Sequence, residues 1–273
     1  MITSFSNPLI KSIRKLSLHK ERQKSGQFLV DGLKGVAEAL QVDAKVDSLI
    51  IAPDLLISGF GQGVVELSQK KSIPIIEVSA EVFATISQKD GPQGIAAIVQ
   101  QNWINLAQIN PGKNEIWIAL ESIQNPGNLG TIMRTGEAIG AKGIILLDQS
   151  TDPYDPTAVK ASMGALFSLK LIKAEFDDFK TWVQAKKVPV IGSSDKAEQD
   201  YMTYPYPDPC ILIMGSERQG LSPCYQYLCE QIVRIPMQGR SDSLNLAMAT
   251  GLILYQIFNQ RRGIELTASR GNR

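Results

Sequence analysis

Apolar positions along the chain alternate between two periodicities, and this alternation predicts an α/β protein. Short apolar runs are typical of strands, as in GQFLVDG at Gly26–Gly32 and EIWIAL at Glu115–Leu120. Segments whose apolar residues recur every three or four positions predict amphipathic helices, as in LKGVAEAL at Leu33–Leu40. Strands and helices that follow one another in this way predict a sheet covered by helices.

The pattern predicts a small α/β domain over residues 1–100. The segment Ile57–Gly63 contains three glycines without the G-x-G-x-x-G spacing, and we interpret it as a flexible loop. The stretch Gln101–Asn114 is polar and contains Pro and Gly, which predicts an interdomain linker. The other expected strands are Ser48–Ile51, Pro74–Val78 and Gly94–Val99, and the other expected helices are Val64–Lys71 and Ala80–Ser87.

A second α/β domain is predicted over residues 115–262, followed by a flexible polar tail at 263–273. Its strands are strongly apolar, which is typical of a parallel sheet covered on both faces. An ordinary Rossmann-like sheet is the default expectation, because knotted chains are rare. After Glu115–Leu120, the expected strands are Gly143–Leu147, Phe167–Ile172, Val188–Gly192, Cys210–Met214 and Ile232–Ile235, and the expected helices are Leu129–Ile139, Pro156–Met163, Asp177–Lys186, Pro223–Leu228 and Leu244–Phe258.

The last of these helices is apolar almost all round. A helix of this kind must be buried against the core and against a second surface, because no face of it suits water. Ser243 directly precedes it and is predicted as its N-cap, since a serine hydroxyl accepts from an unpaired N–H of the first turn.

Charge composition limits how the protein could contact nucleic acid. The 273 residues carry a formal net charge of only +1, so a nucleic-acid contact must come from local patches. The stretch Asn7–Lys24 is such a patch, with helical apolar spacing and a single acidic residue, Glu21. Either a solvated helix face or a surface that contacts phosphates explains it. Its cations are Lys11, Arg14, Lys15, Lys20, Arg22 and Lys24.

Cysteine and histidine content excludes several kinds of site. Cys210, Cys224 and Cys229 lack zinc-type spacing, and their odd number favours free thiols in a reducing compartment. The single histidine, His19, lies in the basic stretch and is predicted at the surface, so histidine-based catalysis and multi-histidine metal sites are excluded. With no bilayer-length apolar run and no signal-peptide pattern, we expect a cytoplasmic protein without a metal site.

Three stretches that each begin at or directly after an expected strand contain the candidate chemistry. In the first, Pro126 and Gly127 interrupt the chain, Asn128 can cap a helix, and Gly130 permits close backbone approach. Arg134 is then predicted in the first or second helical turn. Each stretch alone fits an ordinary strand–turn–helix connection. The three are ESIQNPGNLGTIMRTGEAIGA (Glu121–Ala141), CILIMGSERQGLS (Cys210–Ser222) and IVRIPMQGRSDSLNLAMATGLILYQIFNQ (Ile232–Gln260).

Taken in order, the stretches resemble the three motifs of the SpoU (TrmH) family, the RNA 2′-O-ribose methyltransferases of the SPOUT superfamily. The matching patterns are N-x-G-N-x-G-x-x-x-R, G-S-E-x-x-G-L-S and I-P-M-x-G-x-x-x-S-L-N, within residues 115–260. The segment KASMGALFSL (Lys160–Leu169) is similar to the family's connecting segment. N-P-x-I-K-x-I-x-x-L and F-L-V-D-G in the first domain resemble an RNA-substrate-binding module of the L30e-like kind.

The resemblance implies a fold and a reaction. The C-terminal Rossmann-like sheet would contain a deep trefoil knot, and the protein would be a homodimer through the knotted domain and its final helix. The reaction would transfer a methyl group from S-adenosyl-L-methionine to a ribose 2′-hydroxyl of structured RNA. Family members bind the cofactor largely through main-chain groups, and the matching positions here are Gly215, Ile235 and Leu244, with Met237 and Asn245 nearby.

The resemblance also implies catalytic residues. Arg134 matches the arginine proposed to activate the 2′-hydroxyl. Because a guanidinium stays protonated at neutral pH, clamping the adjacent phosphate and stabilising the forming alkoxide is the safer role. Asn128 and Glu217 would hold Arg134 and the RNA in register, while Ser243 and Asn245 would shape the loop beside the cofactor. For Ser243, a plain helix cap is the alternative.

Several alternatives remain at this stage. Ribosomal RNA, 23S rRNA first, is the preferred substrate, and Lys11, Arg14, Lys15 and Arg134 are the expected RNA contacts; a tRNA substrate stays open. A non-catalytic RNA-binding family member and a nucleotide-dependent enzyme on an unknotted sheet are the other interpretations. Cofactor affinity separates them, since the former predicts none and the latter predicts nicotinamide binding.

Overall fold

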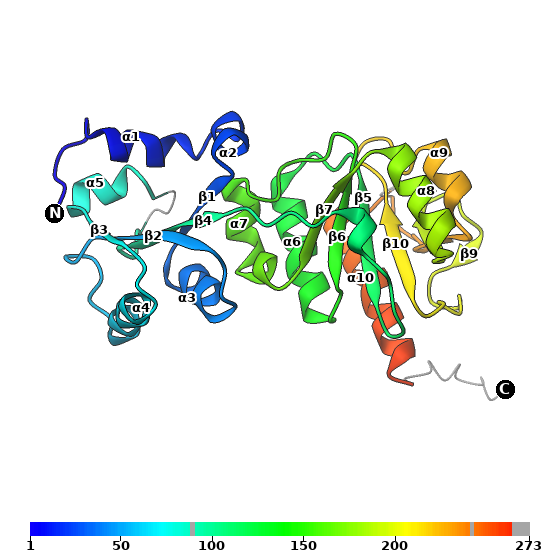
Figure 1. Cartoon of the computed structure of the whole chain (residues 1–273). Helices are drawn as coiled ribbons and strands as arrows, with labels where there is room; N and C mark the ends of the chain where they lie inside the picture. The colour runs from blue at the N-terminus through cyan, green and yellow to red at the C-terminus, as the bar shows by residue number, and fades with distance from the viewer. Residues whose placement is uncertain (88–90, 241–242, 264–273) are drawn as a thin grey trace. The chain divides into compact units, whose positions relative to one another are not determined.

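The computed structural model describes residues 1–87, 91–240 and 243–263, and these form two compact units. Unit 1 contains Met1–Trp103, Asn125–Arg134 and Thr151–Ser168. Unit 2 contains Ile104–Gln124, Thr135–Ser150 and the chain from Leu169 onward. Figure 1 shows the elements in chain order. The predicted tail at 263–273 lies outside the described residues, except for Gly263.

Unit 1 is built on a small mixed sheet. Within the described residues its strands are ordered β1 (Gln27–Asp31), β4 (Ile95–Gln100), β2 (Val46–Ile51) and β3 (Ile75–Glu77). The central strand β4 is antiparallel to both β1 and β2, and β3 is parallel to β2. These strands lie where the apolar runs predicted them.

Helices cover both faces of this sheet. Ile13 of α1 (Pro8–Lys15) and Phe83 of α5 (Ala80–Ala84) share one core with β2 and β4. On the other face, α3 (Leu33–Gln41) packs against α4 (Gly59–Lys70) and the sheet (Figure 1). Unit 1 also contains α2 (His19–Ser25), α7 (Pro156–Ser162) and the 3-10 helix η2 (Ala165–Phe167).

Two expectations for unit 1 were wrong. The basic stretch Asn7–Lys24 forms α1 and α2, since hydrogen-bonded turns at Leu16–Leu18 interrupt the helical pattern. The glycine-containing segment expected as a loop instead begins α4. Ser58 caps that helix by accepting from the N–H of Gly61, so a cap outweighs the low helix propensity of glycine.

Unit 2 is built on a larger parallel sheet, as the apolar strands predicted. In the described part of the chain, all its strand pairs are parallel. The short polar strand β9 escaped prediction because two residues give no periodicity. The strand order is β7 (Lys170–Ala174), β6 (Gly143–Leu147), β5 (Ile116–Glu121), β10 (Cys210–Met214), β8 (Val190–Ser193), β11 (Gln231–Arg234) and β9 (Gln199–Asp200).

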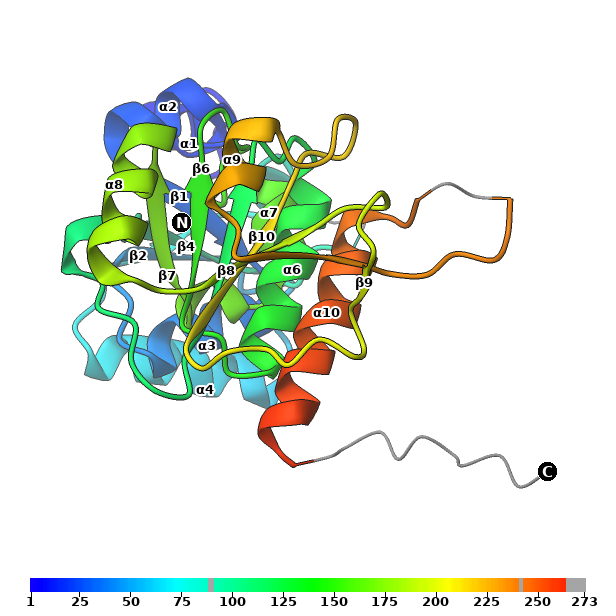
Figure 2. The same ribbon diagram turned by 90° about the vertical axis from the view of Figure 1, so that its right-hand side faces the viewer.

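Helices cover both faces of this sheet as well (Figure 2). On one face α8 (Phe176–Lys186), α9 (Pro223–Leu228) and the 3-10 helix η1 (Leu106–Gln108) pack against Trp117, Ile145 and Ile211. On the other, the end of α6 (Pro126–Ala138) approaches Ile118 and α10 (Leu246–Arg261) contacts β10.

Two further differences from the predicted elements concern the linker and the start of strand β7. Leu106 and Ile109 of the expected linker are buried in the core of unit 2, so this part of the stretch is packed. Strand β7 begins at Lys170, after η2, because Met163 and Gly164 adopt positive φ angles of 53° and 97° and turn the chain. The expected strand at Phe167–Ile172 therefore starts three residues late.

Candidate cofactor and RNA site

The first two motifs meet at one edge of the sheet of unit 2. Strands β5 and β10 are parallel neighbours, with Leu120 opposite Met214, so the loops after them leave the same edge. The Gln124 N–H donates to the Glu217 carboxylate at 3.2 Å, and the Ser222 N–H donates to the Glu121 carboxylate at 2.9 Å. Each loop thus holds the other in place.

Gly215 is required where β10 ends. The loop after it folds back so closely that a Cβ at Gly215 would lie 2.0 Å from the Gly220 carbonyl carbon and 2.1 Å from the Leu221 nitrogen. The N–H groups of Ser216 and Gly220 each donate to the other residue's carbonyl, which closes this loop. Only glycine fits here, so the second motif is a tight backbone loop at the carboxyl edge of the sheet.

The third motif is an open segment between β11 and α10. Residues 235–238 lack regular structure, and Met237 and Leu244 are 38% and 39% exposed. Ser241 and Asp242 lie outside the described residues. An open main chain in this segment suits a ligand held by backbone N–H and C=O groups, as an adenosyl group would be. The donor set therefore fits the expected cofactor.

The predicted cap of the last helix was wrong. Asn245, and not Ser243, is the N-cap of α10, and its side chain accepts from the N–H groups of Ala247 and Met248 at 2.9 and 3.3 Å. Both residue types cap well. Burial decides between them, since Ala247 is buried and Leu244 remains exposed, so the helix begins where the chain reaches the core. Ser243 is exposed in the preceding loop.

The cap of α6 also lies earlier than expected. Asn125 accepts from the N–H groups of Gly127 and Asn128 at 2.8 and 3.1 Å, with Pro126 at the first helical position. Asn128 therefore lies inside the first turn, and Arg134 falls in the third turn, not the first or second. Gly130 does allow a close approach: a Cβ there would lie 2.5 Å from the Ala158 oxygen of α7.

Helix geometry limits how Asn128 could act on Arg134. The two residues are six positions apart on α6, which separates them by about 9 Å along the axis and about 120° around it. Arg134 is exposed and Asn128 is half-buried. The helix therefore does not place one side chain beside the other, and the proposed support of Arg134 by Asn128 needs an intervening group.

Sequence reasoning missed some polar groups at the carboxyl edge of the unit 2 sheet. Glu121 and Gln124 bridge the first two motifs, as described above. The Tyr225 hydroxyl of α9 donates to Asp148 at 2.8 Å, just after β6. Burial and this hydrogen bond raise the pKa of Tyr225. Their position in the sequence was the available signal, since Glu121 ends β5, Gln124 lies in the loop after it and Asp148 follows β6 of a parallel sheet.

Two of the three thiols are poor candidates for a nucleophile. Burial raises the pKa of Cys210 to about 11 and that of Cys229 to about 12, so both stay protonated at neutral pH. Cys224 is exposed, and all three are free, as expected.

The basic helices are only partly available to RNA. Lys11 and Lys15 of α1 are exposed, while Arg14 is half-buried and donates to the Phe5 carbonyl at 2.6 Å. His19 is at the surface, as predicted. Arg22, counted among the basic residues, is only 1% exposed.

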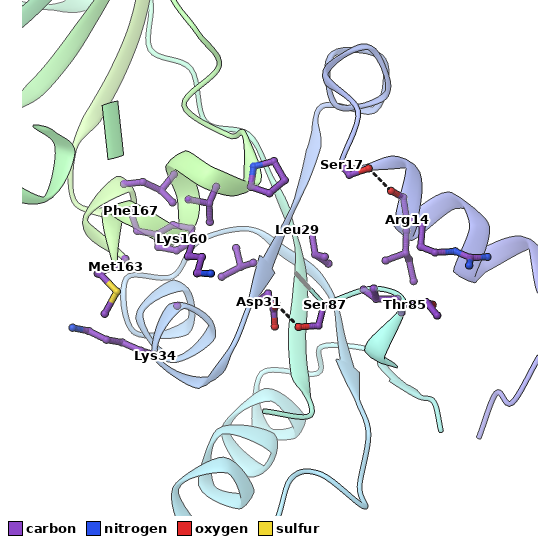
Figure 3. A pocket seen from close by; sticks show the side chains of 18 residues that line it. Arg14, Ser17, Leu29, Asp31, Lys34, Thr85, Ser87, Lys160, Met163 and Phe167 are labelled. Carbon is purple, nitrogen blue, oxygen red and sulfur yellow. Dashed lines mark hydrogen bonds between the residues drawn. The ribbon is translucent and has the colours of Figure 1, made fainter. Parts of the chain in front are cut away.

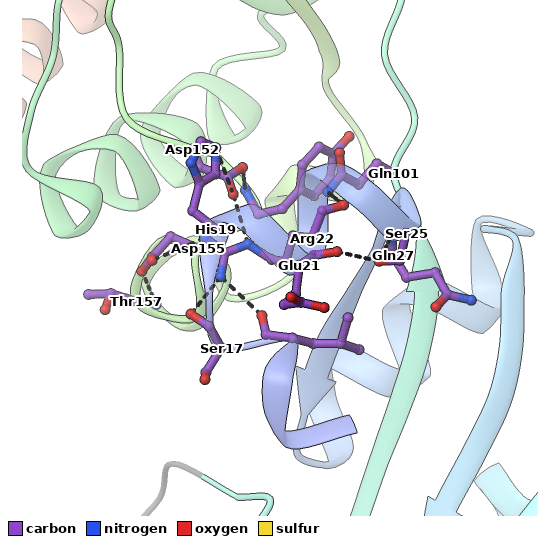
Figure 4. A network of polar contacts seen from close by, with 12 residues as sticks. Ser17, His19, Glu21, Arg22, Ser25, Gln27, Gln101, Asp152, Asp155 and Thr157 are labelled. Atoms are coloured by element: carbon purple, nitrogen blue, oxygen red, sulfur yellow. Dashed lines mark hydrogen bonds and ion pairs between the residues drawn. The ribbon is translucent and has the colours of Figure 1, made fainter. Parts of the chain in front are cut away.

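Arg22 has a structural role (Figure 4). Its guanidinium pairs with Asp152 at 2.8 Å and Asp155 at 3.4 Å, and it also donates to the carbonyls of Leu16 and Ser17. These bonds tie the α1–α2 connection to the segment before α7 within unit 1. Arg22 is therefore not available to contact RNA phosphates, unlike the exposed lysines of this stretch.

The geometry described so far places the protein in a structural class. It is an α/β protein with a parallel sheet, and its three Gly-containing motif loops follow β5, β10 and β11 at the carboxyl edge of that sheet. The chain belongs to the SpoU rRNA methylase family, whose model matches residues 115–255. Residues 7–97 match the model of the MRM3-like substrate binding domain. None of the helices in the described ranges is long and apolar enough to cross a membrane.

Relatives extend over nearly the whole chain. The 23S rRNA (uridine(2479)-2′-O)-methyltransferase of Streptomyces viridochromogenes is 28% identical over 90% of this chain and 87% of its own. The 23S rRNA (guanosine(2553)-2′-O)-methyltransferase RlmP of Bacillus subtilis is 25% identical over 94% and 98%. The crystal structure of an AdoMet-bound rRNA methyltransferase from Sinorhizobium meliloti has a TM-score of 0.87 and 36% identity, over 95% and 97% of the chains.

Proposed function

We propose that this protein transfers a methyl group from S-adenosylmethionine to a ribose 2′-hydroxyl of large-subunit ribosomal RNA. The observation that supports the proposal most strongly is the linked pair of motif loops at the edge of β5 and β10. They contain the motif residues of a SpoU methylase, and the full-length relatives described above are named for this reaction on 23S rRNA.

The cofactor would be held by the main chain. We assign Gly215, Ile235 and Leu244 to this role, with Met237 and Asn245 beside them. When bound, S-adenosylmethionine supplies an electrophilic methyl group on its sulfonium. Strand β11 ends at Arg234, just before Ile235, and Asn245 caps α10, so the segment between them is anchored at both ends.

Arg134 is our candidate for the catalytic residue. Its guanidinium keeps its proton at neutral pH, so it would bind the phosphate beside the target ribose and stabilise the developing alkoxide. We assign Glu217 and Asn128 to holding the first two motifs and the RNA in register, and Ser243 to the loop beside the hydroxyl. The 3.2 Å bond from Gln124 to Glu217 supports the first of these roles.

We further propose a homodimer with a trefoil knot in the C-terminal domain, which works on ribosomal RNA in the cytoplasm. One face of α10 supports the dimer. Met248, Leu252 and Tyr255 recur at helical spacing and are 61%, 39% and 46% exposed, while Ile253 and Ile257 on the other face are fully buried. We keep 1–100 and 115–262 as the proposed limits of the two domains.

A substrate assay tests the RNA assignment. The full chain is incubated with labelled S-adenosylmethionine and unmodified 23S rRNA, 16S rRNA or tRNA. We expect label in 23S rRNA alone. Label in tRNA alone would overturn the ribosomal assignment and leave the methyltransferase in place. Cofactor binding with no label on any RNA, including assembly intermediates of the large subunit, would indicate a non-catalytic family member.

A further inference from the structure

A cavity of about 500 Å³ lies inside unit 1, away from the three motif loops in sequence (Figure 3). Its walls come from α1, β1, α3, the segment after α5, α7 and η2. This volume falls in the range of about 300–1,000 Å³ that is typical of pockets for drug-sized ligands. It is therefore large enough for one nucleotide, and no role has been assigned to it above.

The chemistry of the walls suits a nucleobase. Ile13, Val30 and Val159 are buried and give aliphatic surfaces, and the half-buried Phe167 offers an aromatic ring. Unstacked RNA bases commonly bind such surfaces by stacking. A base that entered this cavity would regain there the stacking that it loses on leaving its RNA helix.

One carboxylate lies in the cavity. Asp31, at the end of β1, accepts from the Ser87 hydroxyl at 2.6 Å (Figure 3). A carboxylate is an acceptor, so it favours a base edge that donates, as the exocyclic amino groups of cytosine, adenine and guanine do. Uracil lacks an amino group and would be the poorest fit.

Three cations also line the cavity. Lys34 and Lys160 are exposed and line the cavity, as does Arg14, against the single carboxylate of Asp31. The exposed Lys11 and Lys15 continue this charge along α1. A polyanionic backbone can therefore pass over the opening while its base enters the cavity.

We propose that this cavity receives one unstacked nucleotide of the substrate RNA, whose amino-bearing base stacks on Phe167 and donates to Asp31. The proposal rests on the proposed RNA function, and it adds a point of sequence recognition distant in sequence from the methyl-transfer motifs. Lys34 and Lys160 would contact the flanking phosphates.

The test is an abasic scan of RNA affinity. Fluorescence anisotropy measures binding of the full chain to a 23S rRNA fragment in which each nucleotide in turn is made abasic. We expect one position at which loss of the base weakens binding about tenfold, the scale of one base–aromatic stack. Leu29→Trp, which fills the cavity from β1, should bind the abasic and intact RNAs equally.

Because Leu29→Trp could fail to fold, a more conservative variant, Asp31→Asn, gives a second test. When the wild-type protein binds an RNA with uridine at the sensitive position, its affinity should be about tenfold weaker, a typical size for discrimination at one base edge. Asp31→Asn should remove this discrimination, whereas Asp54→Asn, an exposed carboxylate outside the cavity, should retain it. Cytidine monophosphate at millimolar concentration should not displace the RNA; displacement would indicate a site for free nucleotides instead.

The outcomes separate the two proposals. If methyl transfer occurs but wild type and Leu29→Trp respond alike at every abasic position, the cavity proposal is overturned and the function stands. If no methyl is transferred but the abasic effect is present and depends on Asp31, the cavity proposal stands and the proposed function fails.

Discussion

Single residues at the motif loops explain most of the local geometry. The sequence indicated which residue types matter, as at Gly130, where the structure shows the expected close approach. It did not indicate which polar residue caps a helix, because Asn125 and Asn128, or Ser243 and Asn245, have similar cap preferences. That choice depends on where the helix meets the core, which is a tertiary property.

Gly215→Ala should disrupt the second motif. The added Cβ would overlap the backbone of Gly220, so we expect a loss of about 1–3 kcal/mol or more in unfolding free energy and loss of cofactor binding. Urea denaturation and calorimetric titration with S-adenosylmethionine measure these effects. The control is Gly63→Ala in α4, where a Cβ meets nothing within 4 Å. Wild-type cofactor affinity in Gly215→Ala would contradict the assignment of this loop.

Arg134→Ala should reduce turnover by about two to three orders of magnitude and leave cofactor binding nearly unchanged. The arginine is exposed on α6, and its loss removes stabilisation of the alkoxide, which costs about 10²–10³-fold in rate. Single-turnover methyl transfer measures the rate, and calorimetry the affinity. Lys142→Ala, an exposed cation just after α6, is the matched control. Full activity of Arg134→Ala would refute its catalytic role.

At the scale of elements, the sequence located most helices and strands but not their ends. Apolar periodicity is local, and so β10 and α9 were predicted with the bounds that the structure has. The division of the basic stretch into α1 and α2 was missed. Arg22 explains this, because its burial against Asp152 requires the carbonyls of Leu16 and Ser17 to turn toward it.

Charge reversal on α1 tests its role in RNA binding. Lys11→Glu and Lys15→Glu together should weaken RNA binding and reduce its salt dependence. The slope of the logarithm of the affinity against the logarithm of the salt concentration should become shallower by about 0.7–0.9 for each phosphate that is no longer neutralised. Lys70→Glu, at an exposed lysine of α4, is the control for a charge reversal outside α1. Filter binding at several salt concentrations gives the slope. An unchanged slope would identify α1 as a solvated helix face.

Substitution on α10 tests the dimer. Met248→Asp with Leu252→Asp places charges on the exposed apolar face, so we expect a monomer by analytical ultracentrifugation where wild type is a dimer. Ile57→Asp replaces an 84% exposed apolar residue of unit 1 and should leave the dimer intact. A dimer that persists in the α10 variant would place the interface elsewhere.

At the scale of the whole molecule, the fold class and the family could be predicted, but the strand order could not. Strand β10 lies between β5 and β8, and this pairing of distant segments leaves no periodic signal in the sequence. The same holds for Asn125–Arg134 and Thr151–Ser168, which join unit 1 although they follow the first strand of the sheet of unit 2. The function could still be predicted, because the order of the three motifs along the chain does not depend on the order of the strands in the sheet.

The position of the transferred methyl group tests the central claim most directly. RNA labelled by the full chain is digested with alkali, which cannot cleave the linkage next to a 2′-O-methyl ribose. We expect the label in an alkali-resistant dinucleotide. Label in mononucleotides would mean that a base is methylated, and the assignment of ribose 2′-O-methylation would be wrong.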